Sequence, residues 1–144
     1  MRFQSIILIF LFLTLSCKDE ETIIEGCTSG RAINFDPDAE VEDGSCQFSQ
    51  AIFYAQFNVV NDERIGSIEI SINGSRIGTI DQFYFNGISG CDDRRGTIPY
   101  RFQSGSVAWA VEIFDLNGNL ILDYRRSTAA SPTESCIEIN VTTN

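Results

Sequence analysis

The strongest constraint on the fold is an alternation of apolar and polar residues in the second half of the chain. Residues 67–72 read Ser-Ile-Glu-Ile-Ser-Ile, and Asn73-Gly74 then leads into a second run at 76–80. Successive side chains of a strand point to opposite faces, and Asn-Gly is the dipeptide best suited to a tight hairpin turn. This segment therefore predicts an antiparallel hairpin with one buried face.

The rest of residues 50–144 repeats this kind of pattern. Residues 107–113 alternate around Trp109, and Asn117-Gly118 precedes a predicted strand at 120–125. Further short strands are predicted at 52–60, 82–85, 97–102 and 136–141. About seven or eight short strands joined by turns are typical of two packed sheets. We therefore predict an all-β fold, an immunoglobulin-like or fibronectin-like antiparallel β-sandwich with Trp109 in its core.

Four of the five cysteines lie after residue 25, an even number that suits an oxidising compartment. Four cysteines allow three pairings. We favour the local one, Cys27 with Cys46 and Cys91 with Cys136, because the first two bracket a distinct motif and the last two lie in the predicted sandwich. Each bridge is expected to stabilise the fold by about 3 to 4 kcal/mol in the chain-entropy model.

Residues 1–16 have the features of a signal peptide. Arg2 supplies a positive start, and the apolar run at 6–15 is shorter than the about 20 residues that span a bilayer. The run ends at Leu15-Ser16-Cys17, which resembles a bacterial lipobox, although Thr14 replaces the usual branched apolar residue. The resemblance implies that Cys17 is lipidated and anchors the chain to a membrane.

An acidic tether is predicted at residues 17–25. Its segment Lys18-Asp19-Glu20-Glu21 resembles the surface-export signal of lipoproteins from Bacteroidota. The resemblance implies a lipid-anchored protein of the outer membrane that faces the outside of the cell. A periplasm-facing protein with a merely solvated tether is the alternative.

Residues 26–48 form a separate cysteine-bracketed acidic segment, which we call the knot. Asn34-Phe35-Asp36-Pro37 and Glu42-Asp43-Gly44-Ser45-Cys46 resemble a short repeat common in secreted and surface proteins of Bacteroidota and other marine microbes. Its oxygen donors suggest calcium as a ligand, held by Asp36, Asp38, Glu40, Glu42 and Asp43. The alternative is a solvated spacer pinned by its disulfide, and Val41 stands where an EF-hand-like loop needs glycine.

Two further groups of residues are candidates for ligand binding. A basic patch able to hold a carboxylate or a sulfated glycan is predicted from Arg94, Arg95, Arg101, Arg125 and Arg126. A sugar-stacking or protein-binding face is considered for Phe53, Tyr54, Phe83, Tyr84, Phe85 and Tyr100. The alternatives are that Asp92 and Asp93 neutralise the arginines of their own loop, and that the aromatic residues pack in the core.

Charge and composition exclude several functions. The formal charge is −10, and it becomes −11 when Arg2 leaves with the signal peptide, so nucleic acid is not an expected partner. The chain has no histidine, which removes the commonest general base and metal ligand. The sequence predicts a non-enzymatic cell-envelope binding or adhesion module with a glycan or protein ligand. The alternative is a structural accessory subunit of an envelope protein complex.

Overall fold

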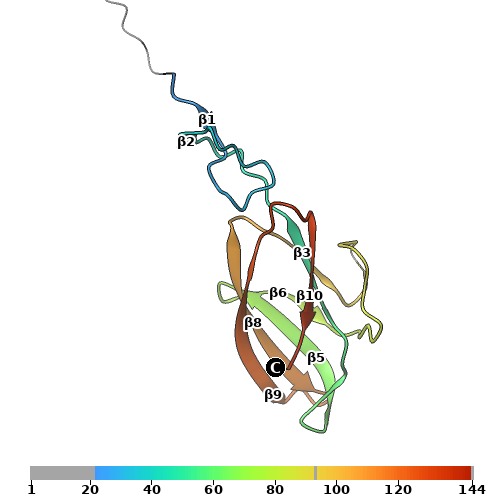
Figure 1. Ribbon diagram of the computed structural model, residues 1–144. Helices are drawn as coiled ribbons and strands as arrows, with labels where there is room; N and C mark the ends of the chain where they lie inside the picture. Colours follow the sequence, from blue (N-terminus) through green and yellow to red (C-terminus); the bar gives the residue numbers. More distant parts are fainter. Residues whose placement is uncertain (1–21, 93, 144) are drawn as a thin grey trace, which may run out of the picture.

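The computed structural model describes residues 22–92 and 94–143. The predicted signal peptide, the lipidation site Cys17 and the export signal at 18–21 lie outside the described residues. Within the described part the chain forms ten strands, and no helix there is long and apolar enough to cross a membrane. Figure 1 shows two bodies in a row, a small one around β1 and β2 and a larger one formed by the later strands.

The larger body is a sandwich of two sheets, as predicted. The first sheet contains, in spatial order, β10 (Cys136–Val141), β3 (Gln50–Ala55) and β7 (Ile98–Arg101). The second has five strands: β4 (Val59–Val60), β5 (Glu63–Ile72), β8 (Ser106–Asp115) and β9 (Leu120–Ala129), with β6 (Ser75–Ile80) also paired to β5. In the small body β1 (Glu25–Gly26) pairs with β2 (Val41–Glu42).

The predicted alternation in β5 and β8 forms the core. Ile70 pairs with Val111 and Ile72 with Trp109, and all four side chains are buried. Phe53 of the first sheet meets them, with its ring centre 5.2 Å from that of Trp109 in an edge arrangement. This contact joins the two sheets. Full burial of a side chain of this size stabilises a fold by about 1.5 to 3 kcal/mol. The predicted core position of Trp109 is confirmed.

Both predicted hairpins are present. Asn73 and Gly74, with φ of 52° and 77°, have the left-handed backbone that a type I′ turn between β5 and β6 requires. Between β8 and β9, Gly118 has φ 84° and donates its N–H to the carbonyl of Asp115. A third hairpin, which the sequence analysis missed, joins β4 to β5 through Asn61 and Asp62, at φ 50° and 65°.

Three strand predictions need correction. The strand expected at 52–60 is broken after Ala55, because the chain leaves the first sheet there and joins the second as β4. Residues 82–85 form a loop and not a strand, and Phe83 packs against the core from this loop. One of the two strand pairs of the first sheet, β10 with the central β3, is parallel and not antiparallel as predicted, with Phe53 opposite Ile139. No hairpin links these distant segments, so packing alone sets their direction.

A long loop covers the outer face of the first sheet. We call residues 81–92 and 94–97 the strap. Gly90 donates its N–H to Glu138 of β10 at 2.6 Å, and the disulfide Cys91–Cys136 holds the strap to the same strand. Ile52 and Tyr54 alternate with the core residue Phe53 and are nevertheless buried. The strap therefore buries the face of β3 that a two-layer sandwich would leave in water, and Figure 1 shows it beside β3.

The knot is held by its own disulfide and by the segment that follows it. Cys27 and Cys46 are bonded, so both bridges have the local pairing that the sequence analysis favoured. The buried Ser49 then fixes the entry to the sandwich: its carbonyl accepts from the Phe102 N–H and its hydroxyl oxygen from the Ser131 N–H. Because buried polar groups must find partners, these bonds define how the chain passes between the two bodies.

Candidate functional site

The outer face of the five-stranded sheet is the open surface of the sandwich, because the strap covers the other sheet. Strand register places side chains of neighbouring strands in rows across this face. Ser71, Ala110 and Arg125 form one row, and Glu69, Glu112 and Asp123 form the next. The face therefore presents small side chains beside charged ones.

A shallow hollow lies over the first of these rows. It measures about 320 Å³ and is lined by Ser71, Asn73, Gly74, Ala108, Trp109, Ala110 and Arg125. A second hollow of about 230 Å³ shares Ser71, Gly74, Ala110 and Arg125 with it and reaches Glu112 and Asp123. We call the two together the trough. Its floor exists because Ala108 and Ala110 occupy outward positions of β8, where longer polar side chains are usual.

Both hydrogen-bond donors and hydrogen-bond acceptors border the trough. Arg125 is exposed and makes no hydrogen bond or ion pair with any described residue, so its five N–H donors are available. Glu112 and Asp123 supply acceptors on the same face. At one edge Arg76 is paired with Glu69 at 2.7 Å, and such an exposed pair contributes little stability. The trough therefore offers donors and acceptors within one small area.

The five predicted basic residues do not form one patch. Arg125 lies on the outer face of β9. Arg126 lies opposite the inward Trp109 in the strand register and so belongs to the inner face. Arg101 belongs to β7 of the other sheet, and Arg94 and Arg95 lie in the strap, where Arg94 donates to the carbonyl of Ser89. Of the five, only Arg125 lines the trough. Arg126 faces the other way because neighbouring residues of a strand do so, and the other three lie on other elements.

The predicted aromatic residues also serve different parts of the structure. Phe53 is in the core, and Tyr54 is buried by the strap, where burial and then the charge of Glu138 raise the pKa of its phenol. Tyr84 donates its hydroxyl to the carbonyl of Arg95, and Tyr100 packs on Phe102 with ring centres 5.6 Å apart. Phe85 differs from the buried members of the set, because its side chain is 60% exposed. These positions fit the core-packing alternative better than a stacking face.

Three acidic side chains of the knot, those of Asp36, Glu42 and Asp43, accept hydrogen bonds from other residues of the knot. Asp36 accepts from the Asp38 N–H, and hydrogen bonds from Ser45 lower the pKa of the Asp43 carboxyl. Glu42 accepts from the N–H and hydroxyl of Thr28, at 3.0 and 3.1 Å. Within the described residues, Cys27, Glu42 and Cys46 are the one group of acidic and sulfur side chains close enough to share an ion, and its sulfurs form the disulfide. The structure does not bring the five predicted calcium ligands together.

Sequence reasoning missed the trough, although its signal was present. Ala108 and Ala110 fall on the solvent side of the alternation in β8, and two successive small residues there leave a hollow. Comparisons of this chain with protein-family models, curated proteins and solved structures find no match. Fold and site thus define a small disulfide-bonded β-sandwich with one open sheet face.

Proposed function

We propose that this protein is a non-enzymatic binding module of the cell envelope whose trough takes a neutral glycan. The observation that supports it is Arg125, which makes no hydrogen bond or ion pair with any described residue and lies beside Glu112 and Asp123, over a floor of Ala108 and Ala110. A sugar hydroxyl both donates and accepts hydrogen bonds, so it matches a site that offers both kinds of group. Small floor residues let a ligand approach the sheet closely.

Charge favours a neutral over an acidic glycan. The chain carries a formal charge of −10, and two carboxylates lie on the same face as Arg125. A polyanion would meet repulsion from both the whole molecule and the site. The sulfated or carboxylated glycan considered from the sequence is therefore the less suitable ligand.

Titration calorimetry with neutral oligosaccharides tests this proposal. Arg125→Ala is expected to weaken binding about tenfold, and Ala110→Leu to weaken it at least as much by filling the floor. Arg126→Ala is the matched control, because Arg126 lies on the same strand and the opposite face. Equal losses from the two arginine variants, or no binding by the native protein, would contradict the proposal.

The lipid anchor and the outward orientation belong to the same proposal. They are supported by the resemblance of residues 15–17 to a lipobox and of 18–21 to an export signal. Cys17→Ser is expected to abolish labelling by radioactive palmitate. Protease added to intact cells is expected to digest the native protein but not a variant with alanine at Lys18, Asp19 and Glu20. Protection of both proteins would indicate a periplasmic location.

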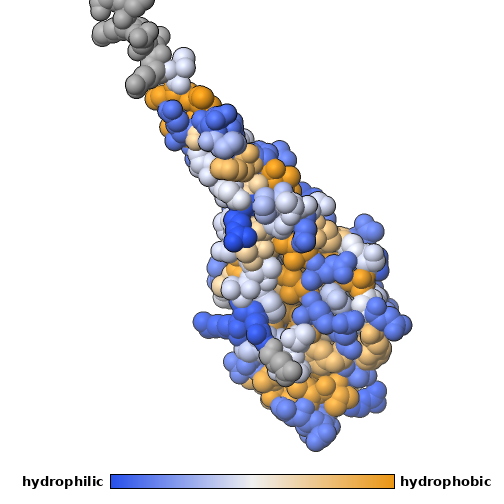
Figure 2. Space-filling model, viewed as in Figure 1, coloured by the Kyte–Doolittle hydropathy of each residue, from blue (hydrophilic) through white to orange (hydrophobic). Residues whose placement is uncertain are grey.

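Exposed aliphatic side chains support the alternative function, an accessory subunit of an envelope complex. Val59, Leu116 and Leu120 are 48%, 68% and 52% exposed, and they belong to β4 and the β8–β9 hairpin. Figure 2 shows hydrophobic residues gathered at the end of the sandwich away from the knot. Gathered exposed apolar residues often mark protein interfaces. In this case Leu116→Ser with Leu120→Ser, and not Arg125→Ala, would release the protein from a co-purifying complex.

A further inference from the structure

Another hollow, separate from the trough, lies where the knot meets the sandwich. It measures about 390 Å³, and we call it the junction cleft. The knot contributes Ser29, Glu42 and Phe48 to its walls, and the sandwich contributes the turn 103–105 between β7 and β8. Ligand sites often occupy such junctions between structural units.

The walls of the junction cleft are fixed by hydrogen bonds within each body and by one close approach between the two bodies. The carbonyl of Gly105 accepts from the Ala130 N–H at 3.0 Å, which holds the turn against the end of β9. A Cβ at Gly105 would lie 3.1 Å from Cβ and Cγ of Arg31, so the turn and the knot are in close contact. On the knot side, Glu42 is held by Thr28 and by the N–H of Gly44 at 3.0 Å.

The free groups of the junction cleft suit a sugar ring. The side-chain amide of Gln103 and the hydroxyl of Ser29 make no hydrogen bond with any described residue. An amide and a hydroxyl can each donate and accept, as the hydroxyls of a neutral sugar require. Phe48 adds an aromatic surface to the lining, and its ring is half-buried. The lining contains the carboxylate of Glu42 and no arginine or lysine, which disfavours an anionic ligand.

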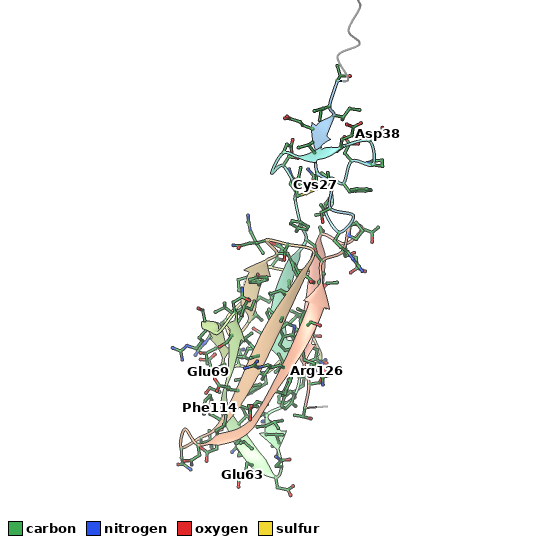
Figure 3. The ribbon with its side chains drawn as sticks, turned by 90° about the vertical axis from the view of Figure 1, so that its left-hand side faces the viewer. Cys27, Asp38, Glu63, Glu69, Phe114 and Arg126 are labelled. Atoms are coloured by element: carbon green, nitrogen blue, oxygen red, sulfur yellow. A yellow bond between two sulfur atoms is a disulfide. The ribbon has the colours of Figure 1, made fainter. Side chains whose placement is uncertain are left out.

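One strand connects the junction cleft with the trough. Gly105 is followed directly by β8, whose outward Ala108 lines the trough. Three residues of strand span about 10 Å, a separation that a short oligosaccharide can bridge. Figure 3 shows the two long strands, β8 and β9, running from the end of the sandwich near Glu63 towards the knot that contains Cys27.

We propose that the trough and the junction cleft are consecutive subsites for one linear neutral oligosaccharide. This inference rests on the proposed function and extends it, because it makes the knot part of the binding site. The ligand class is then a polymer chain rather than a single terminal sugar. Affinity should depend on chain length, with the longer ligand reaching Gln103 and Ser29.

The test compares a disaccharide with a hexasaccharide of the same neutral sugar, using glucose, mannose and xylose series and the full mature chain. For the native protein the hexasaccharide is expected to bind about tenfold more tightly. Gln103→Ala combined with Ser29→Ala should remove that gain and leave disaccharide affinity unchanged. Gln47→Ala is the control, because Gln47 is an exposed glutamine of the knot that lines neither hollow.

The outcomes distinguish failure of this inference from failure of the proposed function. Arg125→Ala is expected to weaken both ligands, which tests the trough. If Arg125→Ala acts as expected but the gain with length survives in the Gln103 and Ser29 variant, the inference is wrong and the proposed function stands. The inference is also wrong if that variant loses the disaccharide. If the native protein binds no neutral saccharide of either length, both proposals are wrong.

Discussion

Arg125 and Arg126 are neighbours on β9 and lie on opposite faces of the five-stranded sheet. In the register of β9 with β8, Arg125 lies opposite Ala110 on the outer face, and Arg126 lies opposite Trp109 on the inner face. The guanidinium of Arg126 lies 5.4 Å from the centre of the Tyr124 ring, where a cation is attracted to the aromatic face. Because β9 is the last strand of its sheet, an inward charge there opposes pairing with another chain.

Arg126→Val is therefore expected to promote self-association. The change removes the inward charge and a cation–π contact of about 0.5 to 1 kcal/mol, and it raises the β propensity of an edge. Light scattering over a concentration series measures the effect. Arg125→Val makes the same change on the outer face and should associate less, so equal association of the two variants would contradict this interpretation.

Gly66→Ala is expected to destabilise the sandwich by about 2 to 4 kcal/mol. Gly66 lies in a bulge of β5, and a Cβ there would clash with the backbone carbonyl of Asp115, whose carbon would be 2.9 Å away. Backbone atoms of a paired strand cannot move aside cheaply. Urea unfolding measures the loss. Gly30→Ala is the control, since a Cβ at Gly30 meets no atom within 4 Å, and it should change little.

The two disulfides are expected to contribute unequally to stability. Cys91–Cys136 closes 45 residues and Cys27–Cys46 closes 19, which corresponds to about 4 and about 3 kcal/mol in the chain-entropy model. Serine at both Cys91 and Cys136 should also free the strap and speed amide exchange in β3. Exchange in β3 that stays slow would show that Gly90 and the other strap contacts suffice to hold it.

The stability of the protein is expected to fall at alkaline pH because of Tyr124. Burial raises the pKa of the Tyr124 phenol to about 12. The unfolded chain ionises this group near its ordinary pKa of about 10 and the folded protein does not, so stability present below pH 10 is lost between about pH 10 and about pH 12. Unfolding measured by urea across this range should show the fall. Tyr124→Phe should make the unfolding free energy fall less steeply with pH. An unchanged fall in this variant would show that other groups cause it.

Calcium is expected to leave the melting temperature of the purified protein unchanged. The carboxylates of Asp36, Glu42 and Asp43 already accept local hydrogen bonds, and the structure does not gather the five acids around one point. A ligand that binds only the folded form raises its stability, so a calcium site would appear as a shift. A rise in millimolar calcium that a chelator reverses would restore the calcium hypothesis for the knot.

Local sequence determined the parts of this protein that depend on neighbouring residues. Alternation in β5 and β8 predicted which faces are buried, and Asn73-Gly74 predicted a turn that only a left-handed backbone can make. The bracketing of the knot by Cys27 and Cys46 indicated its disulfide. The opposite faces of Arg125 and Arg126 were also readable from the period of a strand, although the basic-patch prediction overlooked it.

Only the tertiary structure decided how distant segments meet. The parallel pairing of β3 with β10, the covering of Ile52 by the strap, and the junction cleft between Phe48 and the turn 103–105 involve residues that no local pattern relates. The physical reason is that periodicity and turn propensity act over a few residues. Contacts between segments far apart in the chain depend instead on how complete surfaces pack and satisfy their buried hydrogen-bonding groups.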